Sequence, residues 1–255
     1  MVSHIGAFVK GDIVGKGGKD MFKKAITFSF DDGVVQDKKL VELFNKYGLK
    51  GTFNLNSELL GGPLGSKNQH QTIAPSEIRA VYAGHEVAAH TLRHPFLPSL
   101  DEQEIIRQVE QDRLNLSDMV GYEVVGMAYP CGGQNNDDRT AAIIKNNTGI
   151  RYARALESSH DFKPQENLFR FKSTVYHLNV EQMFELAKQF LELETDEPSV
   201  FYVWGHSFEL DYDQNGWQTF EELCRLVSGK SDIFYGTNRE VLLSDNPHWQ
   251  YRKEN

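Results

Sequence analysis

Two adjacent carboxylates, Asp31 and Asp32, stand at the end of an apolar run and directly before Gly33. The run itself, residues 25–30, is short and rich in β-branched and aromatic side chains, which predicts a buried strand. Two acids at the tip of a buried strand repel each other and lose hydration. A bound cation compensates for this when one carboxylate is a ligand and its neighbour stays free for proton transfer. The alternative is an ordinary strand end followed by an Asp-Gly turn.

A second pair of candidate ligands is His90 and His94, four residues apart and directly after the apolar run 86–89. On a helical turn this spacing places both imidazoles on one face, an arrangement that zinc and similar ions accept. The alternative is one structural and one exposed histidine. Together with Asp32, the two histidines would form a three-ligand site with an open position, as in catalytic metal sites.

These groups must be brought together by the elements that carry them. Helical periodicity over 37–47, followed at once by the apolar run 51–55, indicates a strand–helix–strand unit and therefore a parallel sheet. In such a sheet the carboxyl ends of the strands share one edge, so His90 should lie beside the acidic pair. Further strands are predicted at 124–129, 152–153, 200–204 and 233–235, and further helices at 75–82, 99–120, 137–146, 180–193, 217–227 and 239–243.

Strands and helices alternate from about residue 25 to 245 without a linker or repeat. We therefore predict an α/β protein with a single domain of the (β/α) barrel type over residues 21–255, preceded by an extension, residues 1–20, outside the fold. An open doubly wound sheet is the second choice. The absence of Gly-x-Gly-x-x-Gly after a strand weakens its dinucleotide-binding version. Ser99 and Glu102 have the spacing of a capping box at the start of helix 99–120.

Composition narrows the classes of partner. The net charge of −9, with scattered basic residues, argues against nucleic acid or an anionic membrane as the main partner. No segment approaches the roughly 20 apolar residues needed to cross a bilayer. Residues 1–20 are glycine-rich and polar and lack the apolar core of a secretory signal. Two cysteines form no disulfide framework, so we expect a cytoplasmic protein.

In their order and spacing, the two motifs resemble those of the polysaccharide deacetylase family, the family 4 carbohydrate esterases with a NodB homology domain. The first family motif, Thr/Ser-Phe-Asp-Asp-Gly, is matched by Ser29 to Gly33, and the second, His-Ser/Thr-x-x-His, by His90 to His94. The resemblance covers roughly residues 22 to 245. It implies a distorted, NodB-like (β/α) barrel that binds a divalent metal, usually zinc, although cobalt, nickel or manganese also suit an Asp-His-His set.

Carried over by position, the resemblance implies that Asp31 is a general base and that Asp32, His90 and His94 are metal ligands. The metal would polarise an acetyl carbonyl and activate a water molecule, whose proton Asp31 takes. The stretch from Phe201 to His206 resembles the family's Leu-x-x-His motif, which implies that His206 protonates the departing amine or alcohol.

The third family motif, Arg-x-Pro-Tyr-Gly, is matched only in part by residues 128–132, where Ala128 replaces the arginine and Cys131 the tyrosine. The resemblance implies that the backbone amide of Cys131 helps to stabilise the oxyanion, and we interpret its thiol as a small apolar filler. The arginine that orients the catalytic aspartate is missing. Arg151 or Arg154 on a later strand could take its place, and we favour Arg154.

Other residues near these motifs have open interpretations. Glu209 and Asp211 either orient His206, contact the sugar or are solvated loop acids. The aromatic residues Trp204, Tyr212 and Trp217 could stack on a sugar face, but aromatics in a barrel are more often core, so we expect Trp204 to pack in the core with an edge in the pocket. The loop 61–71 lies where a substrate loop could sit. The remaining histidines have no partner pattern and are interpreted as structural or exposed: His4, His70, His85, His160, His177 and His248.

We therefore predict a metal-dependent hydrolase that removes acetyl groups from N-acetylated (or O-acetylated) sugars or glycan fragments. A covalent acyl-enzyme is not expected, because the strand ends carry neither a serine elbow nor a Cys–His pair. A small non-sugar amide is the alternative substrate, since the arginine motif is altered and no export signal is visible. A non-catalytic glycan-binding module is the alternative of another class, against which Asp31 and His206 argue. The sequence carries no signal for oligomeric state.

Overall fold

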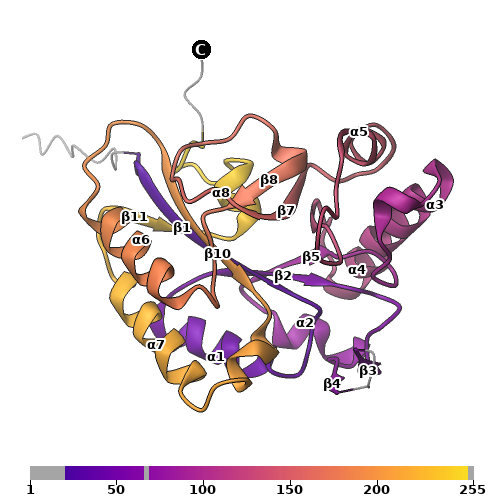
Figure 1. The fold of residues 1–255 in the computed structure, drawn as a ribbon, viewed down its shortest axis with the longest axis horizontal. Coiled ribbons are helices and arrows are strands. Elements are labelled where there is room, and N and C mark those ends of the chain that lie inside the picture. Colours follow the sequence, from indigo (N-terminus) through magenta and orange to yellow (C-terminus); the bar gives the residue numbers. More distant parts are fainter. Residues whose placement is uncertain (1–20, 66–68, 252–255) are drawn as a thin grey trace, which may run out of the picture.

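The computed structural model describes residues 21–65 and 69–251, in which a nine-stranded parallel sheet curves around the core. The strand order is β8-β7-β6-β5-β2-β1-β10-β9, and β11 also pairs with β1. The two ends of this order, β8 and β9, are separated in the chain only by Thr174, whose amide donates to Tyr202 O of β10 at 2.8 Å. The chain itself thus closes the sheet into a distorted (β/α) barrel (Figure 1), which confirms the predicted fold class.

The longer helices and strands alternate as the sequence predicted, whereas β2, β3 and β4, and then β7, β8 and β9, follow one another without an α-helix between them. The strands are β1 (Lys24–Asp31), β2 (Gly51–Leu55), β3 (Pro63–Leu64), β4 (His70–Gln71), β5 (Glu86–Ala89), β6 (Gly126–Ala128), β7 (Tyr152–Ser158), β8 (Phe171–Ser173), β9 (Val175–Tyr176), β10 (Ser199–Gly205) and β11 (Ile233–Tyr235). The α-helices are α1 (Asp37–Tyr47), α2 (Ile78–Val81), α3 (Glu102–Ile106), α4 (Asp112–Val120), α5 (Asp138–Asn147), α6 (Val180–Glu192), α7 (Gly216–Val227) and α8 (Asn238–Leu242). A π-helical segment, Arg107–Gln111, joins α3 to α4, and 3-10 turns lie at Pro75–Glu77, Leu97–Ser99, Leu168–Arg170 and Ser207–Asp211.

The core explains why the central strands are apolar along their whole length. Every residue of β1 and of β10 is buried, because helices cover the outer face of a parallel sheet while side chains fill its inside. Aromatic rings of β1 pack against rings of the covering helices. The ring centres of Phe28 and Phe44 of α1 are 4.8 Å apart, and those of Phe30 and Phe220 of α7 are 5.6 Å apart. In Figure 1, α1, α6 and α7 flank one side of the barrel and α3 and α4 the other. The sheet is therefore a rigid support for the residues at its strand ends.

Two local predictions on the helix 99–120 are wrong. Ser99 lies in a 3-10 turn shaped by Pro98, and the helix is capped instead by Asp101, whose side chain accepts from Glu104 N at 2.9 Å. The long helix is also interrupted by the π-helical segment 107–111. The short strands β3, β4, β8 and β9 were not predicted, because two or three residues carry no periodic signal.

The predicted extension, residues 1–20, lies outside the described residues, and the boundary at residue 21 stays a prediction. None of the described helices is long and apolar enough to cross a membrane.

Candidate active site

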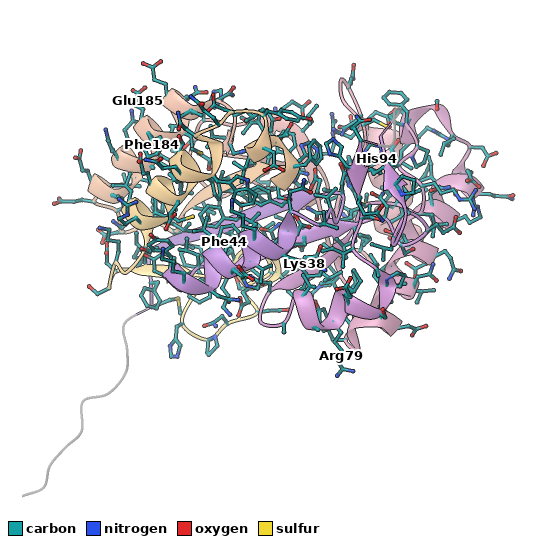
Figure 2. All side chains as sticks on the ribbon, turned by 90° about the horizontal axis from the view of Figure 1, so that it is seen from below. Lys38, Phe44, Arg79, His94, Phe184 and Glu185 are labelled. Atoms are coloured by element: carbon teal, nitrogen blue, oxygen red, sulfur yellow. The ribbon has the colours of Figure 1, made fainter. Side chains whose placement is uncertain are left out.

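Asp32, His90 and His94 meet at the carboxyl-terminal edge of the sheet. β1 and β5 are separated in the sheet only by β2, so the residues that follow them emerge side by side. Asp32 Oδ1 lies 3.7 Å from His90 Nε2 and 3.8 Å from His94 Nε2. Among the described residues this is the one group of three His, Cys, Asp or Glu side chains whose ligand atoms all lie within 4.8 Å of one another. Figure 2 shows His94 in the upper right part of the molecule, whereas Arg79 of α2 lies at the lower edge.

The donor set fits a divalent cation. His90 Nδ1 donates to the carbonyl of Ala128 at 2.9 Å, and burial lowers the pKa of His90 to about 4. The imidazole is therefore neutral, and its Nε2 presents a lone pair to Asp32. Asp32 Oδ1 is itself buried and has no hydrogen-bond partner. A buried carboxylate oxygen and an imidazole nitrogen thus point their lone pairs toward each other. A cation such as zinc binds between groups of this kind.

The two histidines converge without a helix. Residues 90–94 form an irregular turn in which Thr91 has a φ of 72° and His94 a φ of 59°, so the helical geometry expected for this spacing is wrong. Left-handed backbone at these positions reverses the chain and brings His94 back over His90. Of the six described non-glycine residues with positive φ, four lie here, since Asp32 and Cys131 join these two. Such strain is typical of functional sites.

Asp31 is a buried carboxylate with a separate partner on each oxygen. Asn54 Nδ2 donates to its Oδ1 at 2.7 Å, and Arg154 donates to its Oδ2. Burial opposes ionisation, but the charge of Arg154, together with that of His206, outweighs it and lowers the pKa of Asp31 below its ordinary value. Asp31 is thus held as a carboxylate beside the three ligands. Asn54 was missed in the sequence, although it lies near the end of a predicted strand at the same edge.

The structure places Arg154, and not Arg151, against Asp31. Arg154 of β7 is paired in register with Ala128 of β6, and Ala128 stands where the family motif has its arginine. The guanidinium of Arg154 therefore comes from the neighbouring strand. It is buried, and its Cζ lies 4.4 Å from the centre of the Trp204 ring. Arg151 is half-exposed and lies 3.9 Å from Asp245. Trp204 packs on Arg154 and is itself almost fully buried.

His206 lies on the other side of the ligand group, with its Nε2 4.0 Å from Asp32 Oδ2. Its Nδ1 lies 3.0 Å from Glu209 Oε2, and its backbone amide donates to the same oxygen at 3.1 Å. Burial opposes protonation of His206, but Glu209, Asp31 and Asp32 outweigh it and raise the pKa of the imidazole to about 9. The structure therefore presents His206 as a cation that can give up a proton.

Glu209 is in turn held by two residues that the sequence analysis did not connect with the site. His177 Nε2 lies 2.8 Å from Glu209 Oε2, and Tyr176 OH donates to Oε1. His177 is buried at the end of β9, a strand too short to be predicted. Asp211, the other acid near His206, faces away and accepts from Gln36 and Trp217 at 2.9 and 2.7 Å. Of the two acids near His206, the one that contacts it is thus Glu209.

The loop with Cys131 contributes a backbone amide to the same site. Cys131 has a φ of 69°, and its N–H donates to His94 Nε2 at 3.3 Å. Asn135 Nδ2 holds the loop by donating to the carbonyls of Tyr129 and Cys131 at 3.0 and 2.9 Å. The thiol is half-buried and contacts His94 O at 3.3 Å, so it is not enclosed in the core as an apolar filler would be. Burial and the charge of Asp32 raise the pKa of this thiol, which keeps it neutral.

A cleft of about 430 Å³ opens beside Asp32 and His94. The hairpin β3–β4, within the loop predicted as a substrate loop, forms one wall. His70 of this hairpin stacks on Phe208 at 4.0 Å, and the exposed ring of Tyr212 lies next to Phe208. Trp217 is not among the lining residues. A second cleft, of about 420 Å³, lies at the amino end of β1, around Lys23, Lys24 and Asp232, away from these groups.

A sequence profile described as "Polysaccharide deacetylase" matches residues 18–153, more than half of the chain. The chain therefore belongs to the polysaccharide deacetylase family, which confirms the resemblance of its motifs. The peptidoglycan-N-acetylmuramic acid deacetylase PdaC of Bacillus subtilis is 28% identical over 123 residues, 48% of this chain and 24% of PdaC. The chain thus spans about a quarter of the length of that relative.

Solved structures of the family share the fold at low identity. The family 4 carbohydrate esterase from Streptomyces lividans, in complex with acetate, has a TM-score of 0.54 at 16% identity, covering 84% of this chain and 93% of the esterase. A family pseudoenzyme from Bacillus anthracis has the same TM-score and identity, and the match covers 91% of this chain and 67% of the pseudoenzyme chain. The same fold therefore occurs in a named esterase and in a pseudoenzyme, and function must be argued from the site.

Proposed function

We propose that this protein is a metal-dependent deacetylase that removes acetyl groups from N-acetylated (or O-acetylated) sugars or glycan fragments. One observation carries the proposal: a three-ligand group lies between a carboxylate held ionised by Arg154 and an imidazole held protonated by Glu209. A metal-dependent hydrolase that breaks an amide or ester by direct attack of water uses this combination of base, acid and electrophile.

Each residue has a role that follows from its surroundings. Asp32, His90 and His94 would hold the cation, for which zinc is the first candidate and cobalt, nickel and manganese are alternatives. Such a cation polarises a carbonyl and lowers the pKa of water.

Asp31 would accept the proton of the attacking water, because Asn54 and Arg154 hold it as a carboxylate aimed at the site. His206 would give its proton to the leaving amine or alcohol, with Glu209 fixing the ring. The Cys131 amide donates to His94 Nε2 in the structure. Once a cation takes that nitrogen, the amide would be free to donate to the developing oxyanion.

The cleft supports a small substrate. Its volume of about 430 Å³ lies near the lower end of the roughly 300–1,000 Å³ that small-molecule sites occupy. The rings of Phe208 and Tyr212 offer apolar faces against which a sugar ring can pack. Soluble fragments of chitin, xylan or peptidoglycan are therefore better candidates than intact polymer. The name of the Bacillus subtilis relative makes peptidoglycan fragments a specific candidate. A cytoplasmic location, predicted from the sequence, would agree with soluble fragments.

The direct test is acetate release from N-acetylglucosamine oligomers before chelation, after chelation, and after zinc or cobalt is added back. We expect release to stop on chelation and to return with the metal. Equal rates in chelated and reloaded protein would contradict the metal site. A chain that binds one metal ion yet releases no acetate would favour the alternative substrate, a small non-sugar amide, and direct a wider amide screen.

A non-catalytic glycan-binding module is the alternative from another class, since a family pseudoenzyme shares the fold. A binding module gains nothing from a buried Asp31–Arg154 ion pair beside the ligands, and removal of charges from water is costly. Binding of oligomers without any metal-dependent acetate release would support that alternative.

Glu209→Gln is expected to lower kcat for acetate release on the order of 10²-fold, because a neutral amide does not stabilise the protonated form of the His206 ring as a carboxylate does. KM should change little, since Glu209 faces away from the cleft toward Tyr176 and His177. Asp211→Asn in the same turn is the matched control and should stay near wild type. Equal effects of the two substitutions would contradict the role of Glu209.

A further inference from the structure

The turn that carries both histidine ligands is held by side chains from outside it. Asn56 Nδ2 donates to the carbonyls of His90 and Thr91 at 2.5 and 2.9 Å. Within the turn, Thr91 Oγ1 accepts from His94 N at 3.1 Å. Two buried residues of the helix that follows, Asp112 and Gln108, accept from other amides of the turn, and His90 N is shared between Asp112 and Leu55 O, the latter at 2.8 Å.

Asp112 is fully buried at the start of α4, and its two carboxylate oxygens face two different strand ends. Oδ2 accepts from His90 N at 3.0 Å, and Oδ1 accepts from Ser57 N at 2.7 Å. His90 follows β5 and Ser57 follows β2. Among the described residues, no Lys, Arg or His forms an ion pair with Asp112. A buried carboxylate without a cationic partner is costly, so its amide contacts are what hold it in place.

Gln108 reaches the same turn because of the π-helical segment 107–111. Its backbone carbonyl accepts from Leu92 N at 3.0 Å, and its side-chain Oε1 accepts from Arg93 N at 3.2 Å. A π-helical turn widens the helix and changes its ladder of hydrogen bonds, and such turns are frequent at functional sites. The irregular helix and the irregular turn are thus two halves of one hydrogen-bonded unit.

The backbone of the turn explains why it needs this support. Thr91 has a φ of 72°, which is rare for a β-branched residue, and His94 has a φ of 59°. Such conformations persist only where the surrounding structure imposes them. If the turn relaxed, His94 would no longer fold back toward His90 and Asp32.

We propose that Asp112 and Gln108 are positioning residues for the metal site. They hold the strained turn 90–94 in the conformation in which both imidazoles face Asp32, and they thereby set the affinity and geometry of the cation. This inference rests on the cation site of the proposed function, and it does not require that the substrate be a sugar.

The test measures metal binding by the 255-residue chain rather than catalysis. For Asp112→Asn, which places an amide NH₂ against one of the two backbone N–H groups, we expect zinc to bind about 10- to 100-fold more weakly in competition with a chelating dye. The absorption spectrum of the cobalt-loaded variant should also change, because the ligand geometry changes. Gln108→Met removes the side-chain acceptor of Arg93 N and the donor to Glu104 but keeps the backbone carbonyl that accepts from Leu92 N, so it should show a smaller loss in the same direction.

Leu116→Ala is the matched control, since Leu116 lies buried on the same helix α4 and its truncation destabilises the core while leaving the hydrogen bonds of the turn in place. It should bind zinc and cobalt as the wild type does. If Asp112→Asn keeps wild-type affinity and an unchanged cobalt spectrum, the inference is wrong. If Asp112→Asn does not fold, the test falls to Gln108→Met. A zinc affinity and a cobalt spectrum like those of the wild type in Gln108→Met would then show that the inference is wrong. Wild-type protein that binds neither metal would overturn the cation site itself, whereas bound metal without acetate release would overturn only the proposed reaction.

Discussion

Asp31→Asn is expected to lower kcat for acetate release by about 10³- to 10⁴-fold, at the upper end of what general-base catalysis contributes. An amide of the same shape cannot accept the proton of water, and its NH₂ cannot accept from Arg154 where Oδ2 did. The measurement is kcat on N-acetylglucosamine oligomers with saturating zinc. Zinc affinity should change by only a few-fold, because Asp31 is not among the three ligands.

The comparison of activity with metal content makes this result specific. Asp32→Asn, the neighbouring variant, should lose zinc and activity together, whereas Asp31→Asn should lose activity alone. Activity of Asp31→Asn within about tenfold of wild type would remove the assignment of Asp31 as the base. Loss of zinc in both variants would mean that the two carboxylates act as one ligand group.

Arg154→Met is expected to lower the free energy of unfolding by about 3–5 kcal/mol, as breaking a buried ion pair does. The substitution leaves Asp31 as a buried carboxylate with Asn54 as its remaining direct partner. The measurement is urea unfolding of chelator-treated protein, because a bound cation would partly replace the charge of Arg154. Arg151→Met is the matched control, and its exposed and loosely paired guanidinium should contribute less than about 1 kcal/mol.

The double variant Asp31→Asn with Arg154→Met tests the coupling directly. Removing both charges removes the unpaired carboxylate, so the double variant should be more stable than Arg154→Met alone. If the two losses simply add, the residues do not act as a pair, and the explanation of how Arg154 replaces the family's arginine is wrong.

The sequence by itself determined the fold class and the positions of the long elements. Strands buried on both faces must be apolar throughout, and helices that cover a sheet must be amphipathic, so both leave a local pattern. The bounds predicted for 37–47, 51–55, 86–89 and 233–235 coincide with α1, β2, β5 and β11. The acidic pair and His90 could be placed at one edge for the same reason, since each follows a predicted strand.

Only the tertiary structure decided how the site residues contact one another. The choice of Arg154 over Arg151 depends on the register of β7 against β6, which sets Arg154 beside Ala128. The links from Glu209 to His177, and from Asp112 to His90, join segments that no local pattern relates. The turn 90–94 adopts left-handed backbone in place of a helix because the helix α3–α4 and Asn56 hold it there. Strand register and imposed strain arise from contacts between distant residues, so they follow from the packed chain and not from the spacing of its letters.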